Sequence, residues 1–241
     1  MTENNIIYIV KEAENVRNGE NIYKIGQTGR NVKDRLKGYR RGVQEMFETD
    51  LGHEDRKRFE LHMKKKFQWC FTHRPEIGTE YFQGDLDEMI NIIEKLKEDL
   101  KNKFVGYSIL KTFDEEDFEG TVTKVDYLDD GENDGTKIWN VLYEDGDNED
   151  LEKDELDAAM IEYIQNKDCK NDESQFVGYK IRKKFLNEKT SINCVYEGTV
   201  TNVDYLDNGT KIWCILYEDN DIEELEEDEL KMEMIKYIKS T

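Results

Sequence analysis

Cysteine and proline are both scarce in this 241-residue chain, which contains four cysteines and one proline. No two of the cysteines are closely paired, and they lie in separate segments: Cys70, Cys169, Cys194 and Cys214. This distribution fits neither a disulfide framework nor a zinc knuckle, and it favours a reducing compartment. His62 and His73 lie near Cys70, but a helix and a loop would have to rearrange before the three shared a metal. We therefore expect satisfied or exposed roles for them rather than a zinc site.

Long apolar runs are also missing. No run approaches the roughly 18 consecutive apolar residues that span a bilayer, and the start MTENN is not basic and is not followed by a signal-like apolar stretch. We expect a soluble, unsecreted protein of a reducing intracellular compartment: cytoplasm, nucleus, or virus particle or factory. With 38% charged and 37% hydrophobic residues, the chain supports two or three small domains rather than one large core.

Charge is distributed unevenly along the chain, although the formal net charge is −21. Residues 1–103 carry 20 basic and 19 acidic side chains, a net of +1, whereas residues 104–241 carry 15 and 37, a net of −22. The first part can meet phosphate through local basic clusters, while the second would repel nucleic acid and attract basic partners. A further possibility is that the acidic part folds back on the basic helices and competes with DNA.

A strand, a glycine turn and a basic helix are predicted over residues 22–41. Apolar and polar residues alternate up to a turn that begins at Gly26. Asn31 then offers a side-chain oxygen that caps the following helix. Arg35 and Tyr39 fall one turn apart on that helix, so their side chains can share one face.

The rest of the first hundred residues predicts a small α+β domain over residues 1–103. Residues 11–21 are expected to form a polar loop that joins two hairpin strands. The further elements follow from apolar periodicity: strands over 6–10 and 78–82, and helices over 54–67 and 86–101.

An internal repeat occupies the acidic part of the chain. Phe-Val-Gly-Tyr begins one copy at Phe104 and the other at Phe176, and both copies continue with Glu-Gly-Thr-Val-Thr and Gly-Thr-Lys-Ile-Trp. Short strand-forming runs between glycine and acidic turns predict a small five-stranded barrel that ends in a short helix. We expect repeats over 104–165 and 176–241, tethered by a polar linker over 166–175 rather than fused into one core.

Several N-terminal features, taken in order, resemble the GIY-YIG nuclease superfamily, and most closely its phage and large-virus branch with a Tyr-Lys-Ile-Gly-x-Thr motif. The features span about residues 5–85: Ile6-Ile7-Tyr8, then Lys24-Ile25-Gly26, then Arg35 with Tyr39, then Glu60. The resemblance implies an α+β domain with a three-stranded antiparallel sheet and flanking helices. It also implies metal-dependent endonuclease activity on DNA.

The resemblance assigns roles to individual residues. Phosphodiester hydrolysis requires an activated water and stabilisation of developing negative charge, which a hard metal ion on an oxygen ligand supplies. Glu60 would hold one Mg or Mn ion, and Arg35 would clamp the scissile phosphate. Tyr8 would assist proton transfer, and Tyr39 would order the site. Positive charge for flanking phosphates is expected from Lys24, Lys33, Arg56 and Lys64.

Three positions depart from the family pattern. Ile6 stands at the first glycine of the signature, Lys24 at the tyrosine of the second, and Gln27 where a lysine is expected. Tyr23 lies on the opposite strand face and cannot substitute at position 24. Taken singly, the tyrosines are typical core aromatics and the charged residues typical solvated groups. An active nuclease and a retired nucleic-acid-binding domain therefore both stay open.

The repeats resemble Tudor-like modules of the chromatin-reader group. Such modules hold a methylated ammonium in an aromatic cage with a nearby carboxylate. The cage candidates are Phe118 and Tyr143 in the first copy, and Tyr196 and Tyr217 in the second. Gly146 and Asn220 stand where a further aromatic usually lies, and the alternative is that these rings, like Trp139 and Trp213, pack small cores.

Two functions follow as hypotheses. One is a metal-dependent GIY-YIG-type DNA endonuclease that tandem Tudor-like modules target. The other is a non-catalytic nucleic-acid-binding adaptor or viral structural protein whose acidic barrels bind basic, histone-like proteins. Lys24 and Gln27 favour the second. It would be strengthened if Tyr8, Arg35 and Glu60 lay scattered, or if Glu60 formed an ion pair with no cleft beside it.

Overall fold

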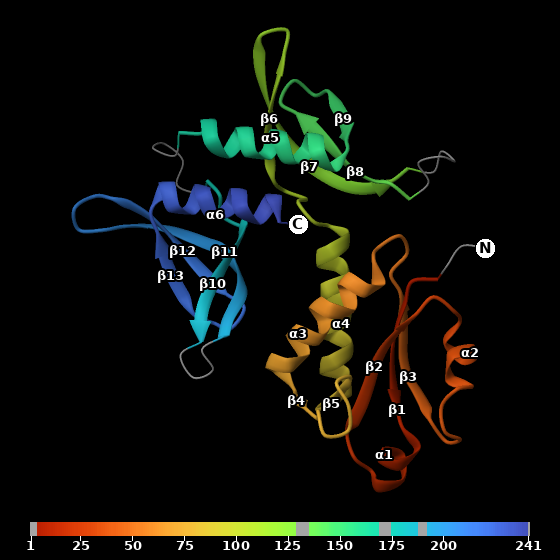
Figure 1. The fold of residues 1–241 in the computed structure, drawn as a ribbon. Coiled ribbons are helices and arrows are strands. Elements are labelled where there is room, and N and C mark those ends of the chain that lie inside the picture. The colour runs from red at the N-terminus through yellow and green to blue at the C-terminus, as the bar shows by residue number, and fades with distance from the viewer. Residues whose placement is uncertain (1–3, 129–134, 169–174, 188–191, 241) are drawn as a thin grey trace. The chain divides into compact units, whose positions relative to one another are not determined.

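The computed structural model describes residues 4–128, 135–168, 175–187 and 192–240 (Figure 1). The chain divides into two compact units, Met1–Lys103 and Phe104–Thr241. Both combine helices with antiparallel sheets, so the expected α+β class is confirmed at this level. Among the described residues, no helix is long and apolar enough to cross a membrane.

The N-terminal unit is built on one five-stranded sheet, not on the three strands expected. All its pairings are antiparallel, in the order β3-β1-β2-β5-β4. The strands are β1 (Ile6–Lys11), β2 (Ile22–Thr28), β3 (Gln44–Asp50), β4 (Thr72–His73) and β5 (Tyr81–Gln83). The two additional strands, β3 and β4, are edge strands. Edge strands bury little surface, so they lack the apolar alternation by which strands are predicted.

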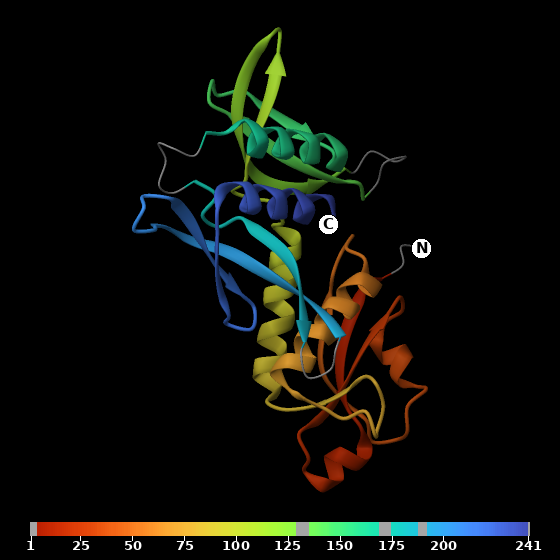
Figure 2. The same cartoon turned by 60° about the vertical axis from the view of Figure 1, so that its left-hand side comes forward.

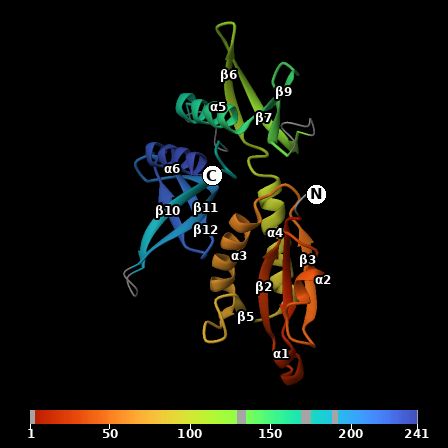
Figure 3. The same cartoon turned by 45° about the vertical axis from the view of Figure 1, so that its right-hand side comes forward.

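Helices cover both faces of this sheet (Figure 3). They are α1 (Ala13–Asn18), α2 (Val32–Leu36), α3 (Arg56–Cys70) and α4 (Leu86–Lys101). The polar loop expected over 11–21 thus contains α1, and α2 ends five residues before the expected position. Asn31 caps α2 as expected, because its Oδ1 accepts the Lys33 N–H at 2.9 Å.

Side chains alternate between the two faces of the sheet along the central strands, so the two faces pack in different hydrophobic clusters. Ile7, Ile9 and Tyr23 belong to the main core, which also takes in α3 and α4. Tyr8 points to the other face and packs in a smaller cluster with Val32 of α2. The prediction that Tyr23 lies on the opposite face is therefore confirmed, and the α2 face is the one that carries Tyr8.

The C-terminal unit contains two copies of one motif, a four-stranded meander followed by a helix. The described residues form four strands per sheet, not the five-stranded barrels expected. In each copy, one long strand with a β-bulge, of 12 residues in the first copy and 14 in the second, runs through a region for which the short strand-forming runs of the sequence predict separate strands. The first copy comprises β6 (Ser108–Phe113), β7 (Glu116–Tyr127), β8 (Lys137–Tyr143), β9 (Asn148–Leu151) and α5 (Lys153–Asn166). The second comprises β10 (Lys180–Asn187), β11 (Ile192–Tyr205), β12 (Lys211–Tyr217), β13 (Ile222–Leu225) and α6 (Glu227–Lys239).

The two copies share one hydrophobic core, which corrects the expectation of tethered barrels. Helices α5 and α6 lie side by side (Figure 2). Tyr107 and Tyr179 stack with ring centroids 4.1 Å apart. Their hydroxyl oxygens accept reciprocal hydrogen bonds of 2.7 Å, Tyr179 from Ser108 N–H and Tyr107 from Lys180 N–H. This exchange is the pattern of an interface between two copies related by a twofold axis.

The repeated Phe-Val-Gly-Tyr motif builds this interface. Phe104 and Phe176 have φ angles of 70° and 67°, and the glycine two residues later also has a positive φ in each copy. Phe104 of the first copy contacts Tyr237 of α6, and Phe176 of the second contacts Tyr163 of α5. Of the expected linker over 166–175, residues 169–174 lie outside the described part of the chain.

Candidate functional site

Tyr8 and Gly26 form the centre of the α2 face. The two residues are paired across β1 and β2. The Tyr8 ring lies so close to the Gly26 backbone that a Cβ at position 26 would be 2.4 Å from both Cζ and the hydroxyl oxygen of Tyr8. Only glycine leaves room for the ring here, which explains why a glycine ends the Lys-Ile-Gly motif.

Three predicted site residues meet at the Tyr8 hydroxyl. The Tyr39 hydroxyl lies 3.2 Å from it, and the Arg35 guanidinium lies over the Tyr39 ring at 5.6 Å from the centroid. Burial and the hydrogen bond with Tyr39 raise the pKa of Tyr8 to about 12, against a smaller lowering by Arg35. The pKa of Arg35 is raised, chiefly by interaction with Tyr8. Tyr8 is therefore a neutral phenol at physiological pH and can donate a hydrogen bond.

Lys24 extends this cluster along β2. Its Nζ lies 5.0 Å from the Tyr39 ring centroid and 5.5 Å from that of Tyr81, and it forms an ion pair of 3.6 Å with Glu80. Tyr81 donates a hydrogen bond of 2.6 Å to Glu12. Sequence reasoning missed Glu12 and Tyr81, because no spacing rule links the end of the first strand to residue 81.

Lys64 joins Glu80 to Glu60, the predicted metal ligand. Its Nζ lies 3.0 Å from Glu60 and 3.3 Å from Glu80. Burial lowers the pKa of Lys64, but the hydrogen bonds and charges of the two glutamates outweigh burial and raise it. Continuous contacts thus run from Tyr8 through Lys24 to Glu60. The structure brings together the catalytic and metal-binding candidates.

The donors near Glu60 suit a hard divalent cation. The Glu60 side chain is 15% exposed and that of Glu80 is 35% exposed, so both carboxylates combine partial burial with access from solvent. Oxygen donors of this kind are what Mg and Mn prefer. Lys64 forms ion pairs with both carboxylates, so a metal ion on Glu60 would compete with its ammonium group.

Arg56 lies one turn before Glu60 on α3. Its Nε donates to Gln27 Oε1 at 2.8 Å, and its Nη1 donates to Asn5 Oδ1 at 2.8 Å. Lys33 is exposed on α2. Within the described part of the chain, no contact joins the Lys33 side chain to the site, so this phosphate-binding candidate lies apart from the others.

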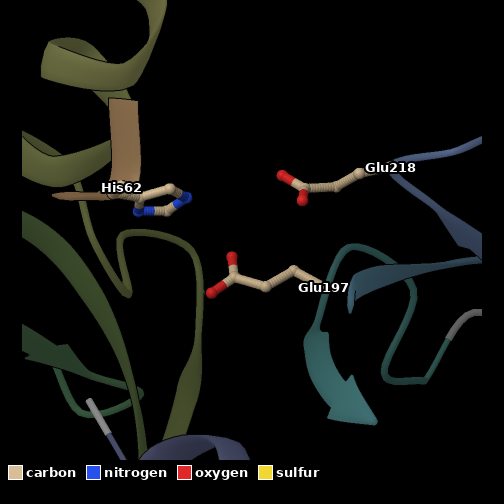
Figure 4. A group of neighbouring side chains, drawn as sticks. All are labelled: His62, Glu197 and Glu218. Carbon is tan, nitrogen blue, oxygen red and sulfur yellow. The ribbon is translucent and has the colours of Figure 1, made fainter. Parts of the chain in front are cut away.

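Figure 4 draws His62 with Glu197 and Glu218 as another group of possible metal ligands. His62 belongs to the N-terminal unit, and the two glutamates belong to the C-terminal unit. The positions of the units relative to one another are not determined, so we assign no metal site to these residues.

Two of the four cage candidates lie in the core of the C-terminal unit. Tyr143 is 5% exposed and Tyr217 is 3% exposed, and they donate hydrogen bonds to Glu149 and Glu223. Burial, followed by the hydrogen bond to its glutamate, raises the pKa of each tyrosine. These rings therefore offer little face to a ligand.

The other two candidates, Phe118 and Tyr196, are partly buried beside a ring from the first strand of their repeat. Phe113 packs edge-on against Phe118 and Tyr143, and Phe185 packs in the same way against Tyr196 and Tyr217. Sequence reasoning missed this third aromatic, although Phe113 and Phe185 occupy equivalent positions in the two copies. Recognition of a methylated ammonium by these rings stays a prediction.

Residues 5–97 match the model of the T5orf172 domain, a domain associated with GIY-YIG- and HNH-like phage nucleases. The matched region contains the residues of the cluster around Tyr8 and Glu60, namely Tyr8, Lys24, Arg35, Tyr39, Glu60, Lys64 and Glu80. No curated protein matches the chain. The match is compatible with a nuclease-like or other nucleic-acid-related function.

Proposed function

We propose that residues 1–103 form a metal-dependent DNA endonuclease domain of the GIY-YIG type. The observation that carries the proposal is the continuous cluster that joins Tyr8, Arg35 and Lys24 to Glu60 through Glu80 and Lys64. Phenol, guanidinium, ammonium and carboxylate groups on one site supply what phosphodiester hydrolysis needs.

Within this proposal, each residue acts through its own chemistry. Glu60 would hold the Mg or Mn ion, which, when bound, would polarise the phosphodiester and acidify water. Arg35 clamps the non-bridging phosphate oxygens, and Lys24 adds positive charge beside it. Tyr8, a neutral phenol with a pKa of about 12, donates a hydrogen bond rather than accepting a proton at neutral pH. Tyr39 holds the Tyr8 hydroxyl and the Arg35 guanidinium in place.

The test is cleavage of supercoiled plasmid DNA by the full chain with Mg or Mn. We expect nicking that Glu60→Gln abolishes and that Arg35→Ala slows about 100-fold. Glu94→Gln, an equivalent change at an exposed position of α4, is the matched control and is expected to cleave like the wild type. Absence of cleavage with either metal, or equal cleavage by Glu60→Gln, would rule out the enzyme.

A non-catalytic nucleic-acid-binding adaptor is the second candidate. The ion pair between Glu60 and Lys64 favours it, because a carboxylate held by lysine is less available to a metal. The same experiment separates the two functions. The adaptor would bind DNA in a gel-shift assay but leave the plasmid intact.

We propose further that the paired repeats bind a basic segment of a partner protein. Charge supports this role, since residues 104–241 carry a net charge of −22. Targeting of the nuclease domain would then come from this unit. Binding of a lysine-rich peptide to residues 104–241, weakened by added salt, is the expected result.

A further inference from the structure

We propose that the Glu80 carboxylate occupies the position of a DNA phosphate and competes with DNA for the lysines of the N-terminal site. Lys24 and Lys64 both form ion pairs with this carboxylate. A phosphodiester is an anion that the same two ammonium groups can bind, so DNA and Glu80 would exclude one another there. The inference rests on the proposed binding of DNA by the N-terminal unit and adds an internal competitor to it.

Basic side chains from different elements converge on Glu80. Lys24 of β2 lies 3.6 Å from Oε2, and Lys64 of α3 lies 3.3 Å from Oε1. The pKa of Arg35, on α2, is raised chiefly by Tyr8, with a smaller contribution from the charge of Glu80. The two oxygens of one carboxylate thus pair with separate cations, as the two non-bridging oxygens of a phosphodiester would.

Lys24 has further contacts that leave its charge available. Its Nζ lies 5.0 Å from the ring centroid of Tyr39 and 5.5 Å from that of Tyr81. A ring face attracts a cation without neutralising it. If the Glu80 carboxylate withdrew, these rings would still hold the ammonium group in the site, with its full charge free to meet a phosphate.

Lys64 is shared with a second carboxylate, that of Glu60, at 3.0 Å. Withdrawal of Glu80 would therefore leave Lys64 partly neutralised but still in place. Lys24 is the lysine that gains most from the exchange of Glu80 for a phosphate.

Only the side chain of Glu80 has to move in this exchange. Glu80 directly precedes β5, and its carbonyl oxygen accepts the Ile25 N–H at 3.0 Å, so its main chain is fixed to β2. The Glu80 side chain is 35% exposed, more than those of Lys24 and Lys64. Ion pairs of partly exposed groups are weak, so an incoming phosphate can displace this carboxylate.

The test measures the affinity of the full chain for a short DNA duplex in EDTA by fluorescence anisotropy. Glu80→Gln keeps the shape of the side chain but removes its charge, so DNA no longer has to displace an anion. We expect binding about 3- to 10-fold tighter. Glu94→Gln removes an equal charge from an exposed position of α4 and is the matched control, which should tighten binding less than about 2-fold.

Thermal unfolding separates competition from a purely structural role. Glu80→Gln removes an ion pair from Lys24, so this variant should unfold at a lower temperature than Glu94→Gln. Inorganic phosphate should raise the unfolding temperature of Glu80→Gln more than that of the wild type, because it can bind the lysines that Glu80 no longer occupies. A purely structural role predicts that stability and DNA affinity fall together.

A second background ties the effect to Lys24. Glu80→Gln combined with Lys24→Gln should bind DNA more tightly than Lys24→Gln alone, but by a smaller factor than Glu80→Gln gives in the wild type. The double variant also keeps the local balance of charge, so this comparison stands if Glu80→Gln alone is too unstable to measure.

Two results would overturn the inference. One is a Glu80→Gln variant that binds DNA no more tightly than Glu94→Gln, and the other is an equal gain with and without Lys24. If the wild type still cleaves plasmid DNA, the proposed nuclease stands and only the competition fails. If neither the wild type nor Glu80→Gln binds DNA in EDTA, the inference fails, and the plasmid assay with metal decides the nuclease separately.

Discussion

At the scale of single residues, the closest fit in the proposed nuclease site is between Gly26 and Tyr8. The glycine is needed for space, since its partner's ring lies directly on the strand backbone. The resulting burial raises the pKa of Tyr8 to about 12, and the Tyr8 hydroxyl lies 3.2 Å from that of Tyr39. A small residue on one strand thus allows the burial that raises the pKa of Tyr8 on the next strand.

Gly26→Ala is expected to push Tyr8 out of its place. The inserted methyl would lie 2.4 Å from the phenol, and such overpacking costs about 1–3 kcal/mol of unfolding free energy. The pKa of Tyr8 should fall from about 12 towards about 10, the usual tyrosine value, as the ring gains water. Chemical denaturation and ultraviolet titration, with Tyr8→Phe to identify the signal, measure the two effects.

Gly38→Ala is the control for this change. A Cβ at position 38 would make an ordinary contact, 3.6 Å from the Arg35 carbonyl oxygen. Its unfolding free energy should stay within about 0.5 kcal/mol of the wild type. Equal stability of the Gly26→Ala and Gly38→Ala variants would contradict the steric explanation.

At the scale of elements, the paired repeats depend on the stacked Tyr107 and Tyr179. Two phenols, each accepting a backbone N–H from the other copy, join the first strands of the two sheets. Burial raises the pKa of Tyr179 to about 12, against a lowering by hydrogen bonds from Ser108. Tyr179 therefore ionises about two pH units lower in the unfolded chain than in the folded protein.

Alkaline pH should weaken the C-terminal unit. Below pH 10 Tyr179 is protonated in both states, and its full contribution to stability is present. As the pH rises from about 10 to 12, only the unfolded chain loses this proton, so stability falls on the order of 2 kcal/mol. Denaturant titrations at several pH values measure the slope, which should be smaller in Tyr179→Phe.

The same variant has a separate effect at neutral pH. Tyr179→Phe leaves the Ser108 N–H without its acceptor, at a cost of about 1–3 kcal/mol. Tyr205→Phe changes a half-exposed tyrosine outside the interface and should cost less than about 0.5 kcal/mol. If the alkaline slope of Tyr179→Phe equals that of the wild type, Tyr179 is not its source.

Some of the helices and strands could be predicted from the sequence alone, and others could not. Strands β1 and β2 and helices α3 and α4 were predictable because each buries a periodic apolar face. Strand β3 and helix α1 were not, since an edge strand and a six-residue helix bury too little to leave a pattern. The shared core of the repeats was missed for another reason. A polar linker predicts independent barrels, but the contacts between the two copies depend on Phe104 and Phe176, which lie outside the linker.

Part of the candidate site could also be predicted from the sequence, because four of its residues follow a recognisable order. Tyr8, Arg35, Tyr39 and Glu60 follow a family order, and the structure brings them to one cluster. The network formed by Glu12, Tyr81 and Glu80 depends on how β5 pairs with β2, which no local pattern encodes. Arg56 was expected beside a phosphate, but its contact with Gln27 joins residues 29 positions apart.

At the scale of the whole molecule, the two units differ sharply in charge. The net charge is +1 for residues 1–103 and −22 for residues 104–241. Acidic groups on one chain raise the cost of bringing DNA to that chain, and salt screens the effect over about 10 Å at 0.1 M. If the acidic unit competes with DNA, DNA affinity would therefore depend on salt in a way that can be measured.

Residues 1–103 alone should bind DNA more tightly than the full chain. The difference should be largest at low salt and should shrink as salt is added, because only the repulsive contribution of the acidic unit is being removed. Fluorescence anisotropy with a short duplex at several salt concentrations measures it. Equal affinities at every salt concentration would show that the acidic unit does not compete.

The reciprocal pairing of the repeats also limits what they can bind together. A twofold rotation reverses every direction perpendicular to its axis. Extended ligands bound to equivalent surfaces of the two repeats would therefore run in opposite senses across the axis. One straight basic peptide cannot fill both surfaces in the same polarity, whereas a peptide that folds back on itself, or two separate tails, can. Avidity for the latter would follow from geometry alone.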